Sequence, residues 1–285
     1  MAKPHRFSTW EGAVQWLRDQ PDKRELVIAA YYDDPLRAAA ERYRRSEEWS
    51  AIRSLLPCDR GAALDVGAGR GIASYALAHE GFQVVALEPD GSALVGAEAV
   101  RSLAKECQLS IEVRQEFSEL LPFQDAQFDL VFARAVLHHT SDLRAACSEF
   151  FRVLKPGGRL LAVREHVISR TEDLDAFLKI HPLHHLYGGE NAFQLKDYEA
   201  AMREAGFEID RVIAPLESAM NFAPHSLKSL QQEIAAKATR NLPIARDLVC
   251  AALGLPGVWS MVAPLFKRID HRPGRLYSFA ATRPE

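Results

Sequence analysis

Residues 62–88 read AALDVGAGRGIASYALAHEGFQVVALE, and this stretch decides the fold. A short apolar run ends at Asp65, a glycine-rich turn follows, and Ile72–His79 has the composition of a helix. Gly81 stands where such a helix is expected to end, and a second apolar run, Gln83–Leu87, leads directly to Glu88. This order predicts a strand, a glycine turn, a helix and a second strand, which is the repeating unit of a parallel α/β sheet with a ligand at the turn.

The glycines of the turn are Gly67, Gly69 and Gly71. Glycine accepts a positive φ and, because it lacks Cβ, lets a ligand lie against the backbone. A dinucleotide-binding turn of the form GxGxxG would need a further glycine at position 72, where this chain has Ile72. Glu88 lies 21 residues after Gly67, close to the separation of roughly 20 at which an acid reaches the ribose hydroxyls of a nucleotide. The turn therefore predicts a nucleotide-like ligand.

Strand and helix patterns continue to alternate after this unit. Residues 92–107 and 142–154 have helical patterns, and residues 110–114 alternate as a strand. Residues 128–132, FDLVF, are apolar on both faces, as expected of a fully buried parallel strand, and residues 159–163 form the next one. The alternation predicts a doubly wound, mostly parallel sheet in the α/β class.

The glycine turn and the segment downstream of it together resemble one known family. Residues 116–161 read EFSELLPFQDAQFDLVFARAVLHHTSDLRAACSEFFRVLKPGGRLL. The turn led by Asp65, then LPF, FDLV, the paired histidines and VLKPGG, resemble the class I S-adenosylmethionine-dependent methyltransferases over residues 60–166. The resemblance implies S-adenosyl-L-methionine as cofactor and a Rossmann-like sheet of seven strands. It also implies a final antiparallel pair of strands, at residues 207–216 and 276–282.

The resemblance also implies roles for individual residues. The turn would shape the methionine pocket, Glu88 would accept from the ribose hydroxyls, and Glu116 or Phe117 would meet the adenine. The residues after the fourth strand would line the sulfonium end of the cofactor. The cofactor contacts expected on this basis are Asp65, Gly67, Ala68, Gly69, Gly71, Glu88, Pro89, Glu116, Phe117, Ala133 and Arg134.

Histidines that follow the fourth and fifth strands are candidates for acting on the substrate. His139 and His166 are the candidate bases for an acceptor hydroxyl, since removal of its proton assists methyl transfer. His185 and Tyr187 lie in HPLHHLYGGENAF, residues 181–193, which we interpret as a substrate loop. A metal site is the alternative for this loop. The sequence argues against it, because no carboxylate stands at a known zinc spacing from these histidines.

The chain divides into three parts on these patterns. Residues 1–57 are expected to form a helical cap or lid, in which residues 35–56 approximate a single helical stripe. Residues 58–216 and 276–285 form the methyltransferase core. Residues 217–275 form a helical insertion before the last strand. The insertion contains 19 uncharged residues, 248–266, whose glycines and prolines argue against a membrane span and favour a buried hairpin or a dimer interface. A membrane-surface patch for a lipid-linked acceptor is the alternative.

Composition limits the partners. The net charge of -3 and the pI of about 6.4 provide no basic field for nucleic acid. The four cysteines are scattered, which indicates free thiols in a reducing compartment, and the first 20 residues lack the apolar core of a secretion signal. We therefore expect a cytoplasmic protein without nucleic acid or a transmembrane span, with a homodimer as one option.

The sequence thus favours a methyltransferase that acts on a small or carrier-linked molecule, most readily at oxygen. Two alternatives remain open at this stage. A nicotinamide-dependent oxidoreductase would need the missing glycine at position 72. A module that binds the cofactor without catalysis would leave the histidines without a role.

Overall fold

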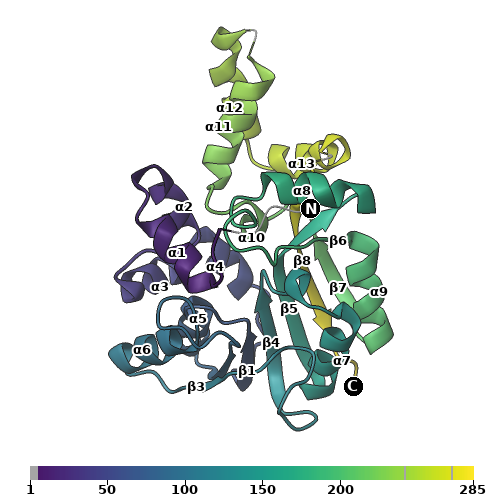
Figure 1. The fold of residues 1–285 in the computed structure, drawn as a ribbon. Helices are drawn as coiled ribbons and strands as arrows, with labels where there is room; N and C mark the ends of the chain where they lie inside the picture. The colour runs from purple at the N-terminus through teal and green to yellow at the C-terminus, as the bar shows by residue number, and fades with distance from the viewer. Residues whose placement is uncertain (1–5, 241, 271) are drawn as a thin grey trace.

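The computed structural model describes residues 6–240, 242–270 and 272–285. Its centre is one mixed sheet with the strand order β3-β2-β1-β4-β5-β8-β7, and the short β6 pairs with β5 (Figure 1). Strands β1 to β6 pair in parallel with one another, whereas β8 runs antiparallel to both of its neighbours, β5 and β7. The strands are β1 (Ala62–Val66), β2 (Gln83–Leu87), β3 (Ile111–Arg114), β4 (Phe128–Arg134), β5 (Leu154–Ile168), β6 (Phe193–Gln194), β7 (Glu208–Ile213) and β8 (Arg275–Thr282). The predicted fold class is confirmed, with β6 as an additional strand of two residues.

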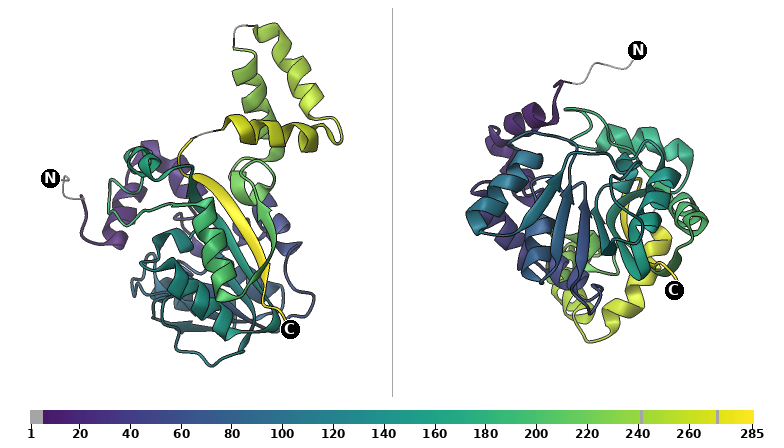
Figure 2. Two further views of the ribbon diagram at one scale, coloured as in Figure 1. Left: turned by 90° about the vertical axis from the view of Figure 1, so that its right-hand side faces the viewer. Right: turned by 90° about the horizontal axis from the view of Figure 1, so that it is seen from below.

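Helices cover both faces of the sheet (Figures 1 and 2). One face carries α3 (Leu36–Arg44), α4 (Glu47–Arg53), α5 (Ile72–His79) and α6 (Ala97–Cys107). The other face carries α7 (Leu143–Val153) and α9 (Leu195–Ala205). The other helices and helical turns that precede β6 are α1 (Trp10–Arg18), η1 (Pro21–Lys23), α2 (Arg24–Ala29), η2 (Leu137–His139), η3 (Thr171–Asp173) and α8 (Leu174–Ile180).

Strand β4 shows why the central strands are apolar on both faces. Leu130 and Phe132 belong to the core on the α5 side, while Val131 and Ala133 belong to the core on the α7 side. Successive side chains of a strand point to opposite faces, so a strand between two helical layers needs apolar residues at every position. Residues 130–133 satisfy this requirement, while Asp129 near the start of the strand pairs with Lys155 instead.

The predicted helical stripe at residues 35–56 is wrong as a single helix. Helix α3 ends at Arg44, and Ser46 starts α4 by accepting a hydrogen bond from the backbone N–H of Trp49. A serine in this position satisfies one of the free N–H groups of a new helix, which allows the chain to change direction. Tyr43 and Trp49 are nevertheless both buried, as the stripe predicted.

Helices α10 (Ala219–Phe222), α11 (Leu227–Ala238), η4 (Pro243–Ala245), α12 (Arg246–Leu253) and α13 (Val258–Ile269) lie between β7 and β8. Figure 2 shows α11 and α12 projecting from the body of the protein. The expectation of a hairpin buried within this chain is wrong for much of residues 248–266: Leu248 is 74% exposed and Met261 is 76% exposed. No described helix is long and apolar enough to span a membrane alone, and α12 and α13 pass such a test only as a pair bent by 107°.

A buried ion pair joins the N-terminal helices to the sheet. Arg134, at the end of β4, donates two hydrogen bonds to the carboxylate of Glu48 in α4, at 2.6 and 3.1 Å. The guanidinium also lies 5.6 Å from the ring centre of Tyr31 and 5.4 Å from that of Tyr43. Glu48 is 1% exposed, so its charge depends on this partner rather than on water.

Replacing Glu48 should therefore destabilise the protein. Glu48→Gln leaves Arg134 buried without a counter-charge, and the free energy of unfolding should fall by about 3–5 kcal/mol, measured by urea unfolding. Glu47→Gln is the matched control, because Glu47 lies one residue away on the exposed side of α4 and should change the free energy by no more than about 0.5 kcal/mol. Equal effects of the two substitutions would contradict the assigned role of the ion pair.

Candidate active site

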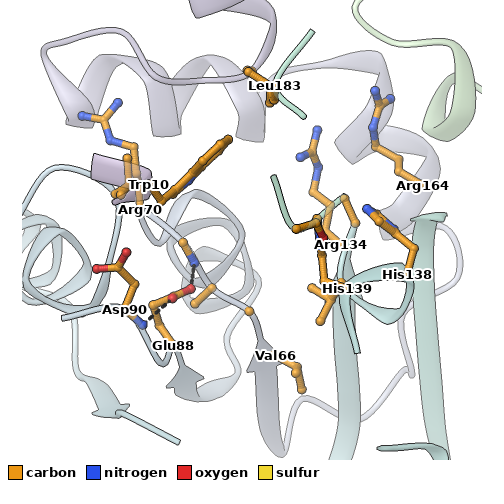
Figure 3. A pocket seen from close by; sticks show the side chains of 18 of the residues that line it. Trp10, Val66, Arg70, Glu88, Asp90, Arg134, His138, His139, Arg164 and Leu183 are labelled. Carbon is orange, nitrogen blue, oxygen red and sulfur yellow. Dashed lines mark hydrogen bonds between the residues drawn. The ribbon is translucent and has the colours of Figure 1, made fainter. Parts of the chain in front are cut away.

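One cavity lies over the carboxyl ends of the central strands. Its volume is about 720 Å³, within the range of about 300–1,000 Å³ usual for small-molecule sites. Ligands of doubly wound sheets bind where the strand order reverses, and here the order reverses between β1 and β4. Figure 3 shows Glu88 and Asp90 on one side of this pocket and Arg134, His138 and His139 on the other. The cavity therefore brings the glycine turn and the histidines of the chain together.

The glycine turn needs its glycines for backbone shape. Gly67 has a φ of 62° and Gly69 a φ of 54°, both in the region that side chains disfavour. A Cβ on Gly67 would also lie 2.6 Å from Cγ2 of Val136, whereas a Cβ on Gly69 would meet nothing closer than 3.9 Å. The space over Gly69 is thus open to the cavity. Gly71, with a φ of 80°, is the residue before α5 and packs against Val100 instead.

Glu88 supports the same turn from the end of β2. Its carboxylate accepts hydrogen bonds from the backbone N–H groups of Gly69, at 2.7 Å, and Asp90, at 2.9 Å. Burial raises the pKa of Glu88 above its ordinary value. Each carboxylate oxygen has a second lone pair, so Glu88 can accept further hydrogen bonds from a ligand in the cavity.

Most of the side chains predicted from sequence line this cavity. They are Asp65, Gly67, Ala68, Gly69, Glu88, Pro89, Glu116, Phe117, Arg134, His139, His166 and Tyr187. Three predicted residues do not line it. Ala133 is buried in β4, Gly71 lies behind the turn, and His185 hydrogen-bonds through Nε2 to the carbonyl of Lys179 at 2.7 Å. The geometry therefore separates His185 from the other candidate residues.

The N-terminal segment closes one side of the cavity. Trp10, Tyr31 and Tyr32 are among its lining residues. Arg70, in the glycine turn, donates to the backbone carbonyls of Tyr31, at 3.0 Å, and Asp33, at 2.9 Å. Arg70 was not identified from the sequence, because only the fold brings it against a segment nearly 40 residues earlier. These bonds hold the N-terminal segment over the glycine turn.

A protein carboxylate lies beside two arginines of the cavity, Arg134 and Arg164. Glu48 accepts from Arg134, and its Oε2 lies 3.8 Å from Nη1 of Arg164. The Arg164 guanidinium also donates to the carbonyl of Met220 at 3.0 Å. Glu48 was missed because its place in a run of charged helical residues gives no sign of burial. The two arginines therefore already have a counter-charge.

A second buried carboxylate, Glu165, fixes the turn after β4. It accepts hydrogen bonds from the backbone N–H groups of Val136 and His138, both at 3.1 Å, and from Nδ1 of His138 at 2.6 Å. The ring of His138 is buried, which holds its pKa well below the usual range and keeps it neutral. With Nδ1 donating to Glu165, Nε2 of His138 carries the lone pair. Sequence reasoning missed Glu165 as a site residue.

His139 and His166 also have defined proton positions. Nδ1 of His139 lies 2.8 Å from the carbonyl oxygen of Gly189, and Nδ1 of His166 lies 3.0 Å from that of Gly274. A carbonyl only accepts, so each Nδ1 donates, and in the neutral form of each ring the lone pair is on Nε2. Burial, followed by the neighbouring His138, lowers the pKa of His166 to about 3.

Glu190 is the carboxylate among these rings. Its side chain is 7% exposed, and its Oε2 lies 3.8 Å from Nε2 of both His138 and His139. Its Oε1 lies 3.7 Å from Nδ1 of His181. The neighbouring Gly188 and Gly189 both have positive φ, a conformation that glycine accepts and that lets the chain turn tightly. The turn brings Glu190 back toward the end of β5.

Comparison with known proteins identifies the core of this fold. Residues 64–162 match a family model described as a methyltransferase domain. O-methyltransferase resE of Aspergillus sclerotiorum is 28% identical over 192 residues, 65% of this chain and 69% of that protein. Malonyl-[acyl-carrier protein] O-methyltransferase of Enterobacter lignolyticus is 36% identical over 146 residues, 49% of this chain and 53% of that protein.

A solved structure shows the same fold. Geranyl diphosphate C-methyltransferase of Streptomyces coelicolor, in complex with Mg²⁺, geranyl diphosphate and S-adenosyl-L-homocysteine, superposes with a TM-score of 0.58 at 17% identity. The superposition covers 89% of this chain and 87% of that one.

The alignments with the curated relatives are partial. The aligned part of this chain spans 32%, 44% and 49% of the length of three further curated relatives. The comparisons therefore identify the domain and its cofactor, and they concern only this part of the relatives. The chain contains a class I methyltransferase domain, and the cofactor of that domain is S-adenosylmethionine.

Proposed function

We propose that the protein transfers a methyl group from S-adenosylmethionine to an oxygen atom of a small or carrier-linked acceptor. The observation that carries this proposal is the single cavity in which Glu88 and the glycine turn face His139 and its neighbours. The relatives named as O-methyltransferases support oxygen as the acceptor atom, and the name of one of them specifies an acyl-carrier protein.

The cofactor end of the cavity suits an adenosyl group. In this proposal, the free lone pairs of Glu88 accept from the ribose hydroxyls, and the open space over Gly69 receives the methionine part. Glu116 and Phe117, which line the same end, provide a polar group and a ring for the adenine. Asp65 shapes the turn, since Oδ2 accepts from the hydroxyl of Ser74 in α5 at 2.5 Å.

Bound S-adenosylmethionine supplies an electrophilic methyl group on a sulfonium, and transfer leaves the neutral thioether with the electron pair of the broken C–S bond. The protein aligns the acceptor oxygen for in-line attack and receives its proton as the new O–C bond forms. A hydroxyl has a pKa far above neutrality, so a nearby base contributes substantially.

We propose His139 as this base in preference to His166. Both rings present a lone pair at Nε2, and both line the cavity. A base with a pKa of about 3 accepts a proton weakly at neutral pH, which argues against His166. Tyr187, whose ring centre lies 5.8 Å from that of Trp10, would then position the acceptor. We propose no substrate contact for His185, because it lies outside the cavity.

Because the cofactor is S-adenosylmethionine, the alternative of a nicotinamide-dependent oxidoreductase is excluded. A cofactor-binding module without catalysis is the remaining alternative, and a turnover assay separates it from the enzyme. The division into cap, core and insertion, the homodimer and the cytoplasmic location remain predictions. The exposed side chains of α12 and α13 support the insertion as a surface for a partner or a carrier.

Cofactor binding should depend on Glu88 and Gly67. Glu88→Ala removes the ribose acceptor and a support of the turn, while Gly67→Val strains the positive φ and collides with Val136. Both should weaken S-adenosylhomocysteine binding at least about 100-fold, a loss of about 2.7 kcal/mol, by isothermal titration calorimetry. Glu112→Ala, which removes an exposed acid from the adjacent strand β3, should bind like the parent. Unchanged affinity in both site variants would refute the assigned cofactor end.

Turnover should depend on His139 without a matching effect on cofactor affinity. His139→Ala removes the proposed base, so kcat with a methyl acceptor should fall by roughly 10²–10⁴-fold. Candidate acceptors are found by incubating metabolite extracts with methyl-labelled cofactor. His185→Ala is the matched control and should retain the kcat of the parent. A His139→Ala variant with full kcat would exclude the base assignment, and the absence of label transfer in any extract would favour the non-catalytic alternative.

A further inference from the structure

Three side chains that line the cavity lie close enough together to bind one metal ion. They are His166 at the end of β5, His181 directly after α8, and Glu190 in the loop before β6. One ligand atom from each lies within 4.8 Å of the other two. Nδ1 of His181 is 3.7 Å from Oε1 of Glu190. Two ligands bound to the same tetrahedral zinc at about 2.1 Å are about 3.4 Å apart, so His181 and Glu190 already lie close to that spacing.

The protonation of His166 suits a metal ligand. Its Nδ1–H donates to the carbonyl of Gly274 at 3.0 Å, which leaves the lone pair on Nε2. Histidine ligands almost always donate their other ring N–H to a carbonyl or carboxylate in this way, because the bond fixes the tautomer and the ring orientation. Phe177 also packs against His166 and His181, at ring-centre distances of 4.8 and 5.2 Å. Two of the three groups are therefore held in place without an ion.

A ring nitrogen of His181 provides independent support for a bound ion. Its Nδ1 is buried and has no hydrogen-bond partner among the residues that the structure describes. An unpaired polar atom in such a place costs stability, and native proteins rarely retain one without a ligand, water or ion. Glu190 provides the negative charge that a divalent cation requires.

We propose that His166, His181 and Glu190 bind a divalent transition metal of the zinc class. Two imidazoles and one carboxylate are a ligand set of catalytic zinc sites, which keep a further position open for water or substrate. All three residues line the cavity, so the open position faces the space proposed for the acceptor.

This inference revises the expectation of no metal drawn from the sequence. That expectation rested on the absence of a carboxylate at a known zinc spacing from the histidines of the loop. The structure brings Glu190 to His181 through the turn at Gly188 and Gly189, and it adds His166 from β5. His185, which stands at helical spacing from His181, instead bonds to a backbone carbonyl.

The role of the ion rests on the proposed function, whereas its binding does not. A metal with an open position would bind an acceptor oxygen and lower the pKa of its hydroxyl. His139, whose Nε2 lies 3.8 Å from Glu190, would stand beside that oxygen to receive its proton. The chemical class of acceptor implied is a molecule with a hydroxyl or carboxyl group that can bind a metal.

Metal binding can be measured without turnover. The full-length protein, stripped with a chelator and dialysed against Zn²⁺, should retain one equivalent by elemental analysis, and Co²⁺ should give visible absorption bands in its place. His181→Ala and Glu190→Gln should each weaken Zn²⁺ binding by roughly 100-fold or more. Circular dichroism and calorimetry with S-adenosylhomocysteine on the same samples report folding and the cofactor end separately.

Two control variants test the identity of the ligands. His185→Ala changes a histidine of the same loop outside the triad, and His139→Ala removes the neighbour from the alternative group around Glu190. Both should bind Zn²⁺ like the parent. A parent protein that retains no metal would overturn the proposal, as would folded His181→Ala and Glu190→Gln variants with unchanged affinity. The proposal would also be overturned if the His139→Ala variant lost its metal while the His181→Ala variant retained it, because the ligands would then be those of the alternative group.

Discussion

The geometry of this cavity depends on buried carboxylates at the carboxyl edge of the sheet. Glu165, at the end of β5, accepts from two backbone N–H groups of the turn after β4 and from the ring of His138. A fully buried carboxylate is costly unless such donors surround it, so the turn and the ring are held in one arrangement. This fixed turn determines where His139 lies. Because Nε2 of His139 is 3.8 Å from Oε2 of Glu190, the turn also determines the shape of the part of the cavity that the histidines line.

Two further charges join the N-terminal helices to the same edge. Glu48 reaches Arg134 at the end of β4, and Arg70 in the glycine turn reaches the backbone of Tyr31. The helices that precede β1 therefore cover the cavity through contacts with the strand ends themselves. Opening this segment would break the Glu48–Arg134 ion pair and the hydrogen bonds of Arg70, so the N-terminal helices form a structural wall of the cavity.

The sequence predicted the sheet because local patterns determine it: strand β2 and helix α5 have the predicted bounds. The cofactor end was predictable for the same reason, since its glycines and Glu88 belong to one local unit. The cluster of His166, His181 and Glu190 was not, because β5, the end of α8 and a loop meet only in the folded chain. The burial of Glu48 could not be predicted either, because its partner Arg134 is distant in the sequence. The exposed side chains of α12 and α13 show that an uncharged stretch does not by itself determine which surface it packs against.

The central claim is that one cavity holds a methyl donor at the glycine turn and a metal-bound acceptor site at the histidines. A crystal structure with S-adenosylhomocysteine and Zn²⁺, with anomalous data at the zinc edge, tests it most directly. The account predicts the ribose hydroxyls on Glu88, the sulfur facing His139, and one zinc peak between His166, His181 and Glu190. A nucleoside bound away from Glu88, or a map without zinc at these three residues, would contradict it.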